Sequence, residues 1–176
     1  MVLYVLAGLL VLAAVFFIMK ANAASEVFSR FGVSESTHQL LGSDLGGSTK
    51  GIRLSRYSIN GMADAVFASK RAKELVVGEF KSRKYKGRVR YYEFYQVQLY
   101  MGHLAEKYPG HTIKGCLAYA DGRQPVNFDP AVYEGLIAMR GEVVATLRNR
   151  KTANSVPLHK RIGVATKNNH LRLVGN

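Results

Sequence analysis

The chain has 176 residues, 48% of them apolar, which is enough for one sizeable hydrophobic core. Its 25 Lys and Arg against 12 Asp and Glu give a net charge of +13, which favours an anionic partner such as nucleic acid or an acidic membrane surface. The single cysteine, Cys116, excludes an intrachain disulfide and any cluster held by several cysteines of this chain. We expect Cys116 to be a small buried residue in a strand.

The first 19 residues contain no charged side chain and are rich in Leu, Val, Ala and Phe. At about 1.5 Å per residue they form roughly 28 Å of helix, so we predict a single-pass transmembrane anchor over residues 1–20. Basic residues follow this segment and favour a bacterial-type inner membrane with the body in the cytoplasm. The alternative is a secretory signal cleaved near Ala23, which would release a periplasmic or secreted protein.

Residues 21–50 are expected to join the anchor to the body. A short helix is predicted over 24–31, with Val27, Phe28 and Phe31 on one side. Residues 34–50 are richer in Gly, Ser and Thr and are predicted to be a loop or a broken helix.

Residues 51–151 are predicted to form the main domain. Three strands are expected over 52–59, 63–68 and 74–81, with a turn at Asn60 and Gly61, as an antiparallel meander. A basic stretch leads into an amphipathic helix over 91–108, and a strand over 112–120 and a short strand over 125–128 follow. Asp129 and Pro130 open a long helix to about Lys151, and 152–176 is a basic segment without a clear assignment. The fold class is therefore α/β with a mixed central sheet flanked by helices.

Three polar residues interrupt apolar, strand-like runs in the middle of the chain: Asp64, Glu79 and Lys81. A charged group in such a position carries a desolvation cost unless it is paired or binds a metal. Glu79 and Lys81 are two residues apart and project to the same face of a strand, and pairing of the second and third strands brings Asp64 close to them. Taken singly, Asp64 could cap a turn and Glu79 could pair with Lys81. Taken together, they favour a site for Mg²⁺ or Mn²⁺ beside a catalytic lysine.

The ordered set of Asp64, Glu79-Phe80-Lys81 and, on the following helix, Gln96 and Tyr100 resembles the PD-(D/E)XK nuclease superfamily. The resemblance covers roughly residues 52–136 and is greatest to the RecB-type nuclease domain and the CRISPR-associated RecB-like exonucleases. It implies a restriction-endonuclease-like core. It also implies that Asp64, Glu79 and the Phe80 carbonyl bind the metal and that Lys81 is catalytic, with Gln96 and Tyr100 bracing the site or touching the DNA backbone.

Two features depart from that family. Its iron-sulfur branch uses four cysteines, so no iron-sulfur cluster is expected in a chain with Cys116 alone. Its upstream motif, a His or Glu on the first helix, is not clearly matched, and His38 and Glu26 are the candidates. The polar stretch around His38 favours an exposed histidine, and Glu26 could as easily be a solvated helix residue.

A basic run begins at the predicted site and is interleaved with tyrosines, a composition that suits contacts to phosphates and stacking on unpaired bases, although it could also be a solvated loop face. Its nucleic-acid-binding candidates are Arg83, Lys84, Lys86, Arg88, Arg90 and Tyr92.

The sequence thus predicts a membrane-anchored, metal-dependent DNA nuclease, exo- or endonuclease, with protein partners in DNA processing as a further expectation. The alternative is an inactive nuclease-like module that tethers DNA or a DNA-processing complex to the membrane.

Overall fold

The computed structural model describes residues 10–13, 15–16, 24–45 and 50–175. The predicted anchor over 1–20 therefore lies mostly outside the described residues, although 10–13 and 15–16 are helical. Among the described residues, no helix has both the length and the apolar character needed to cross a bilayer.

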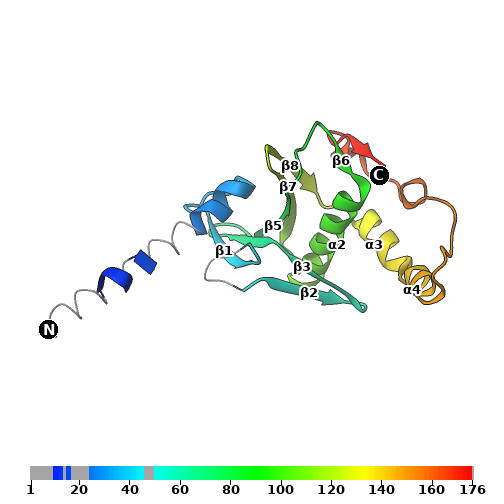
Figure 1. Cartoon of the computed structure of the whole chain (residues 1–176), viewed down its shortest axis with the longest axis horizontal. Coiled ribbons are helices and arrows are strands. Elements are labelled where there is room, and N and C mark those ends of the chain that lie inside the picture. Colours follow the sequence, from blue (N-terminus) through cyan, green and yellow to red (C-terminus); the bar gives the residue numbers. More distant parts are fainter. Residues whose placement is uncertain (1–9, 14, 17–23, 46–49, 176) are drawn as a thin grey trace.

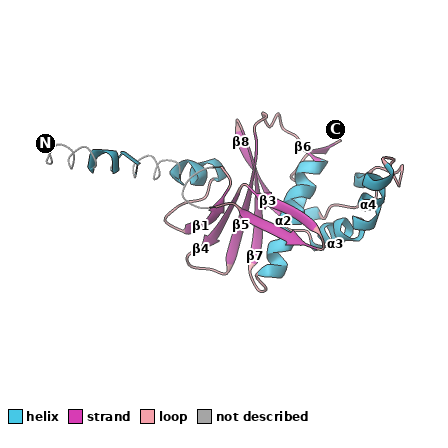
Figure 2. Ribbon diagram, turned by 60° about the horizontal axis from the view of Figure 1, so that its bottom comes forward, coloured by secondary structure: helices cyan, strands magenta, loops and turns pink. Residues whose placement is uncertain are grey.

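A five-stranded mixed sheet forms the centre of the protein (Figure 1), and its strand order is β1-β4-β5-β7-β8 (Figure 2). Only β5 and β7 run parallel, and the other neighbours in this sheet are antiparallel. The strands are β1 (His38–Ser43), β4 (Ala65–Ser69), β5 (Glu74–Lys81), β7 (Thr112–Tyr119) and β8 (Gly122–Asn127). The predicted α/β class with a mixed sheet flanked by helices is confirmed.

Helices cover both faces of this sheet (Figure 2). Helix α2 (Tyr91–Lys107) lies in the connection from β5 to β7 and packs on one face of the sheet. Such a crossover is needed because β5 and β7 are parallel. Helices α3 (Pro130–Ala138) and α4 (Arg140–Asn149) follow β8, and a single residue, Met139, separates them. The long helix predicted from Asp129 is thus divided in two, and Asp129 caps the first part by accepting a hydrogen bond from the Val132 amide.

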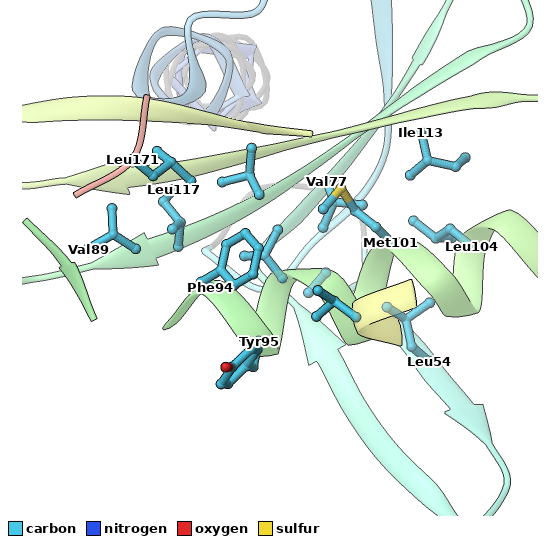
Figure 3. Packing of buried hydrophobic residues seen from close by; sticks show 14 of the residues in the cluster. Leu54, Val77, Val89, Phe94, Tyr95, Met101, Leu104, Ile113, Leu117 and Leu171 are labelled. Carbon is cyan, nitrogen blue, oxygen red and sulfur yellow. The ribbon is translucent and has the colours of Figure 1, made fainter. Parts of the chain in front are cut away.

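The main core lies between the sheet and α2, where Val77 and Leu117 face Phe94 and Met101 (Figure 3). The helix over 24–31, which was predicted, packs Val27, Phe28 and Phe31 against Phe67 on the opposite face. A side chain at Gly78 would lie 2.6 Å from the Phe31 ring, so glycine allows this helix to approach the sheet closely.

Two predictions on the N-terminal half of the domain are wrong. Residues 38–43 form strand β1 rather than a loop or broken helix, because pairing with β4 stabilises a segment whose own strand propensity is low. Asn60 and Gly61 lie inside strand β3 (Ile59–Ala63) and not at a turn. The turn is made by Tyr57 and Ser58, both with positive φ, between β3 and strand β2 (Ile52–Arg56).

The β2–β3 hairpin is a separate two-stranded sheet, and β6 (Val89–Arg90) pairs with β9 (Leu173–Val174) in another. The C-terminal segment, which had no assignment from its sequence, also contains the short 3₁₀ helices Leu158–Lys160 and Thr166–Asn168. It returns to the body of the protein, where Ile162 and Leu171 are buried in the main core.

Candidate metal and phosphodiester site

Asp64 occupies the bend at which the chain leaves the hairpin and enters the central sheet, between β3 and β4. Its carbonyl accepts hydrogen bonds from the Asp44 amide (2.9 Å) and the Ser43 hydroxyl (2.8 Å). Its carboxylate accepts a hydrogen bond of 2.6 Å from the Phe80 amide. Asp64 is therefore held from β1 and β5 together, which brings it next to the Glu79-Phe80-Lys81 segment as predicted.

Glu79 and Lys81 share one face of β5, and the Lys81 ammonium donates to Glu79 Oε1 over 3.0 Å. Glu79 is only 5% exposed, and its second carboxylate oxygen, Oε2, is buried with no hydrogen-bond partner among the described residues. Phe80 points to the opposite face, where it packs with the cluster that includes Phe31 and Phe67. The alternation predicted for this strand is confirmed.

The Lys81 ammonium makes a second contact, donating to Gln96 Oε1 over 2.8 Å. The Gln96 amide nitrogen in turn donates to the Tyr100 hydroxyl over 3.0 Å. Four side chains from β5 and α2 thus form a continuous series, Glu79 to Lys81 to Gln96 to Tyr100. Gln96 and Tyr100 are four residues apart and lie on adjacent turns of α2, which is why that spacing aligns them.

Two acidic groups are brought together here at an energetic cost. Burial raises the pKa of Asp64, and the hydrogen bond from the Phe80 amide and the charge of Lys81 oppose this only in part. Burial also raises the pKa of Glu79, the charge of Asp64 raises it further, and Lys81 opposes both effects. Like charges in a partly dry site are expected to attract a cation.

The donor atoms present suit a hard divalent cation. Two carboxylates, one of them with an unpartnered buried oxygen, fit the preference of Mg²⁺ for one or two protein carboxylates, with water and phosphate as the remaining ligands. Within the described part of the chain, no three His, Cys, Asp or Glu side chains are grouped to hold a metal, so any site here depends on backbone, water or substrate oxygens as well.

The two upstream candidates occupy different places. His38 lies at the start of β1, with its Nε2 3.7 Å from Glu74, which begins β5, whereas Glu79 and Lys81 end that strand. The structure does not bring His38 to the cluster. Glu26 pairs with Arg30 at 2.6 Å and lines a cavity of about 620 Å³ together with Phe80, Tyr119 and Arg123.

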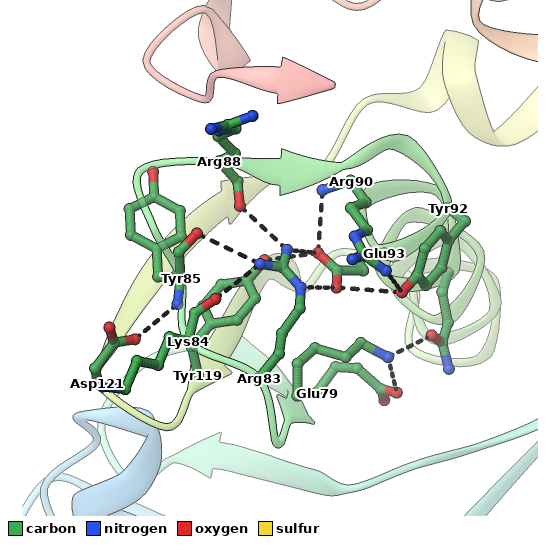
Figure 4. A network of polar contacts seen from close by, with 12 residues as sticks. Glu79, Arg83, Lys84, Tyr85, Arg88, Arg90, Tyr92, Glu93, Tyr119 and Asp121 are labelled. Carbon is green, nitrogen blue, oxygen red and sulfur yellow. Dashed lines mark hydrogen bonds and ion pairs between the residues drawn. The ribbon is translucent and has the colours of Figure 1, made fainter. Parts of the chain in front are cut away.

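The basic run is divided by its contacts. Arg83 is directed inward, where its guanidinium donates to both carboxylate oxygens of Glu93 (2.8 and 2.6 Å) and to the carbonyls of Lys84 and Arg88 (Figure 4). It also lies 4.7 Å from the centre of the Tyr119 ring. These contacts occupy Arg83 within the protein, so its predicted role in nucleic-acid binding is less direct than that of its neighbours.

The other members of the run are exposed. The Arg88 side chain is directed away from the Glu93 network, and the Arg90 guanidinium donates to the Tyr92 hydroxyl over 3.2 Å (Figure 4). These exposed residues are Lys84, Lys86, Arg88, Arg90 and Tyr92.

Sequence reasoning missed three residues that organise this region. Ser43 holds the Asp64 carbonyl, and the positive charge of Arg30 acts on the Asp64 carboxylate. Glu93 is fully buried and anchors Arg83, the Arg90 amide and the Tyr119 hydroxyl. The only signal for Glu93 was its place three residues after the N-cap of α2, where glutamate completes a capping box.

Comparison with known proteins finds no matching family model and no matching curated protein. Among solved structures, the chain is similar to the crystal structure of SSO0001, with 18% sequence identity and a TM-score of 0.38. The match covers 79% of this chain and 60% of that chain, so this chain spans less than two thirds of SSO0001. A similarity of this size assigns neither family nor function.

We predict that, when no divalent cation is present, ionisation of Glu79 lowers the free energy of unfolding as pH rises. Because its pKa is raised in the folded state, the stabilising protonated form is fully present below the ordinary value of 4.5 and is lost as pH rises through the folded pKa. In a chelator, the free energy of unfolding of the wild type should therefore fall relative to that of Glu79→Gln as pH rises above 4.5. Denaturant titrations at several pH values measure this difference, and parallel curves for the two proteins would contradict it.

We also predict that Arg83→Met destabilises the fold. Burial alone would raise the pKa of Glu93, but the hydrogen bonds from Arg83, the Arg90 amide and Tyr119 outweigh burial and lower it. Removal of Arg83 leaves a fully buried carboxylate without its main partner, at a cost of about 3 kcal/mol. Urea unfolding measures this cost, with the exposed neighbour in Lys84→Met as the control that should change by less than about 0.5 kcal/mol. Equal effects of the two substitutions would show that the Glu93 network does not stabilise the protein.

Proposed function

We propose that this protein is a divalent-metal-dependent DNA nuclease of the PD-(D/E)XK type that hydrolyses phosphodiester bonds. The observation that carries the proposal is the hydrogen-bonded series from Glu79 through Lys81 and Gln96 to Tyr100, with Asp64 joined to the same strand through the Phe80 amide. This one cluster unites five residues of the family resemblance that are separated along the chain: Asp64, Glu79, Lys81, Gln96 and Tyr100.

Asp64 and Glu79 would hold Mg²⁺ or Mn²⁺, and the Phe80 carbonyl is a further proposed ligand. Such an ion, when bound, polarises the scissile phosphate and lowers the pKa of a coordinated water. The unpartnered Glu79 Oε2 supports this role, because a buried carboxylate oxygen without a hydrogen bond needs some compensating positive charge.

Lys81 is suited to orient the attacking water or to stabilise the charge that develops on the phosphate. Its ammonium is held on two sides, by Glu79 and by Gln96, so its position does not depend on substrate binding. Gln96 is in turn oriented by Tyr100 and acts as a positioning residue for Lys81.

The surroundings of the cluster favour a polyanionic substrate. The exposed side chains of Lys84, Lys86, Arg88 and Arg90 follow directly after Lys81. On the other side of β5, Arg30 and Arg123 line the cavity beside Phe80, and the Arg30 guanidinium lies 4.3 Å from the centre of the Phe80 ring. The exposed cations that follow Lys81 suit contacts to a DNA backbone at the site, and the charge of Arg30 acts on the Asp64 carboxylate as well.

The proposal includes attachment to the cytoplasmic face of a membrane through the N-terminal apolar segment. Its support is the sequence, which lacks charged side chains over residues 1–19 and carries Lys20 directly afterwards.

The test is cleavage of linear and circular DNA in the presence of Mg²⁺ or Mn²⁺. We expect Asp64→Asn, Glu79→Gln and Lys81→Met each to reduce cleavage by at least about a hundredfold, since each removes a group that acts on the transition state. DNA binding, measured in a chelator, should be retained. A chelator should abolish cleavage by the wild type.

Lys114→Met is the matched control, because Lys114 pairs with Glu74 at the other end of the sheet and should leave cleavage unchanged. Binding without cleavage in the wild type, under either metal, would contradict the nuclease and would support the alternative of a module that tethers DNA to the membrane.

A further inference from the structure

A second cavity, of about 350 Å³, adjoins the hydrogen-bonded series from Glu79 through Lys81 and Gln96 to Tyr100, here called the catalytic series. It lies on the side of α2 that faces away from the sheet. Its walls come from the β2–β3 hairpin, α2, α3 and the C-terminal segment. The lining residues are Leu54, Ile59, Asn60, Gly61, Tyr92, Tyr95, Gln96, Leu99, Tyr100, His103, Leu136 and Leu158. Its size is at the lower end of the range for small-molecule sites, about 300 to 1,000 Å³, and suits one flat ring system better than a stacked series.

Aromatic rings dominate the α2 wall of this cavity: Tyr92, Tyr95, Tyr100 and His103 lie on successive turns. Tyr95 is directed away from the sheet (Figure 3), and its hydroxyl is buried without a hydrogen-bond partner among the described residues. Gly61 completes the opposite wall, since a side chain there would collide with the Tyr100 ring. The cavity thus combines stacking surfaces with an unused polar group.

The cavity is not suited to a charged ligand. No Asp, Glu, Lys or Arg is among its described lining residues, and burial lowers the pKa of His103, which disfavours the charged imidazolium. A phosphate would find no counter-charge here, whereas an uncharged aromatic ring would find both surface and hydrogen-bonding groups.

Two residues belong both to this cavity and to the catalytic series. Gln96 accepts from Lys81 and Tyr100 accepts from Gln96, so the cavity begins one hydrogen bond away from the proposed catalytic lysine. A molecule that occupies the cavity while its phosphate reaches Lys81 would carry an uncharged group next to that phosphate, and the tyrosine rings favour an aromatic one. A nucleotide with its base unpaired has this structure.

We propose that this cavity binds one unpaired nucleobase next to the scissile phosphate, so that the protein acts on single-stranded or frayed DNA ends in preference to intact duplex. The inference rests on the proposed nuclease function and specifies its substrate. Stacking on the exposed ring of Tyr92 would supply the affinity, because every base presents a flat face and such contacts do not depend on sequence.

The test is the binding, in a chelator, of a short single-stranded oligonucleotide that contains the fluorescent base analogue 2-aminopurine, compared with the same strand in a blunt duplex. We expect quenching on binding of the single strand and little quenching with the duplex. Tyr92→Leu should weaken single-strand binding about tenfold and restore the fluorescence, with an unchanged salt dependence because no phosphate contact is lost. Tyr57→Leu is the matched control: both tyrosines are 45% exposed, and Tyr57 lies outside the cavity lining.

Leu99→Phe, which narrows the same cavity, should also reduce quenching, and thermal unfolding checks that both variants are folded. Absence of quenching in the wild type, or equal effects of Tyr92→Leu and Tyr57→Leu, would overturn the base site even if the protein cleaves DNA. Quenching that depends on Tyr92, in a protein that fails to cleave with Mg²⁺ or Mn²⁺, would instead keep the base site and remove the nuclease.

Discussion

The repulsion between two carboxylates in a partly buried site is the constraint around which this region is arranged. Burial raises the pKa of both Asp64 and Glu79, and the charge of Asp64 raises the pKa of Glu79 further. The fold nevertheless holds Asp64 at three points, through Ser43, Asp44 and Phe80. The proposed cation, bound between two acidic groups held this firmly, would stabilise the folded protein, and this linkage would connect the fold to the proposed chemistry.

The region next to the carboxylates is organised by a second buried charge. Glu93 accepts from Arg83, from the Arg90 amide and from Tyr119, and these contacts determine how the loop between β5 and α2 is folded. With Arg83 directed inward, the neighbouring basic residues are directed outward. One arginine therefore stabilises the loop while the remaining cations form the surface that a DNA backbone would meet, and Tyr92 lies between that surface and the proposed base cavity.

The sequence was most informative where a local pattern determined the result. The strand that ends in Glu79-Phe80-Lys81, the helix over 91–107 and the proximity of Asp64 to Glu79 all follow from periodicity and short connections. Strand β1 did not follow, because its pairing with the distant strand β4 overrode a weak local preference. The turn at Tyr57 and Ser58 did not follow either, because the register of β2 with β3 places the attractive Asn60-Gly61 pair inside a strand. The inward contacts of Glu93 with Arg83 and Tyr119 join distant segments, so its capping position alone did not reveal them. The cavity behind Gln96 depends on how α2, α3, the hairpin and the C-terminal segment come together, which no local pattern encodes.

The most direct test of the central claim is to locate the cation on the polypeptide. Fe²⁺ substituted at the site generates hydroxyl radicals in the presence of ascorbate and peroxide, and these cut the backbone near the metal, so mass spectrometry of the fragments maps its position. The account predicts cuts close to Asp64, Glu79 and Phe80. Added Mg²⁺ should suppress these cuts by displacing Fe²⁺, and the cuts should be absent in Glu79→Gln. Cuts elsewhere, or cuts at these positions that Glu79→Gln leaves unchanged, would show that the two carboxylates do not form a metal site.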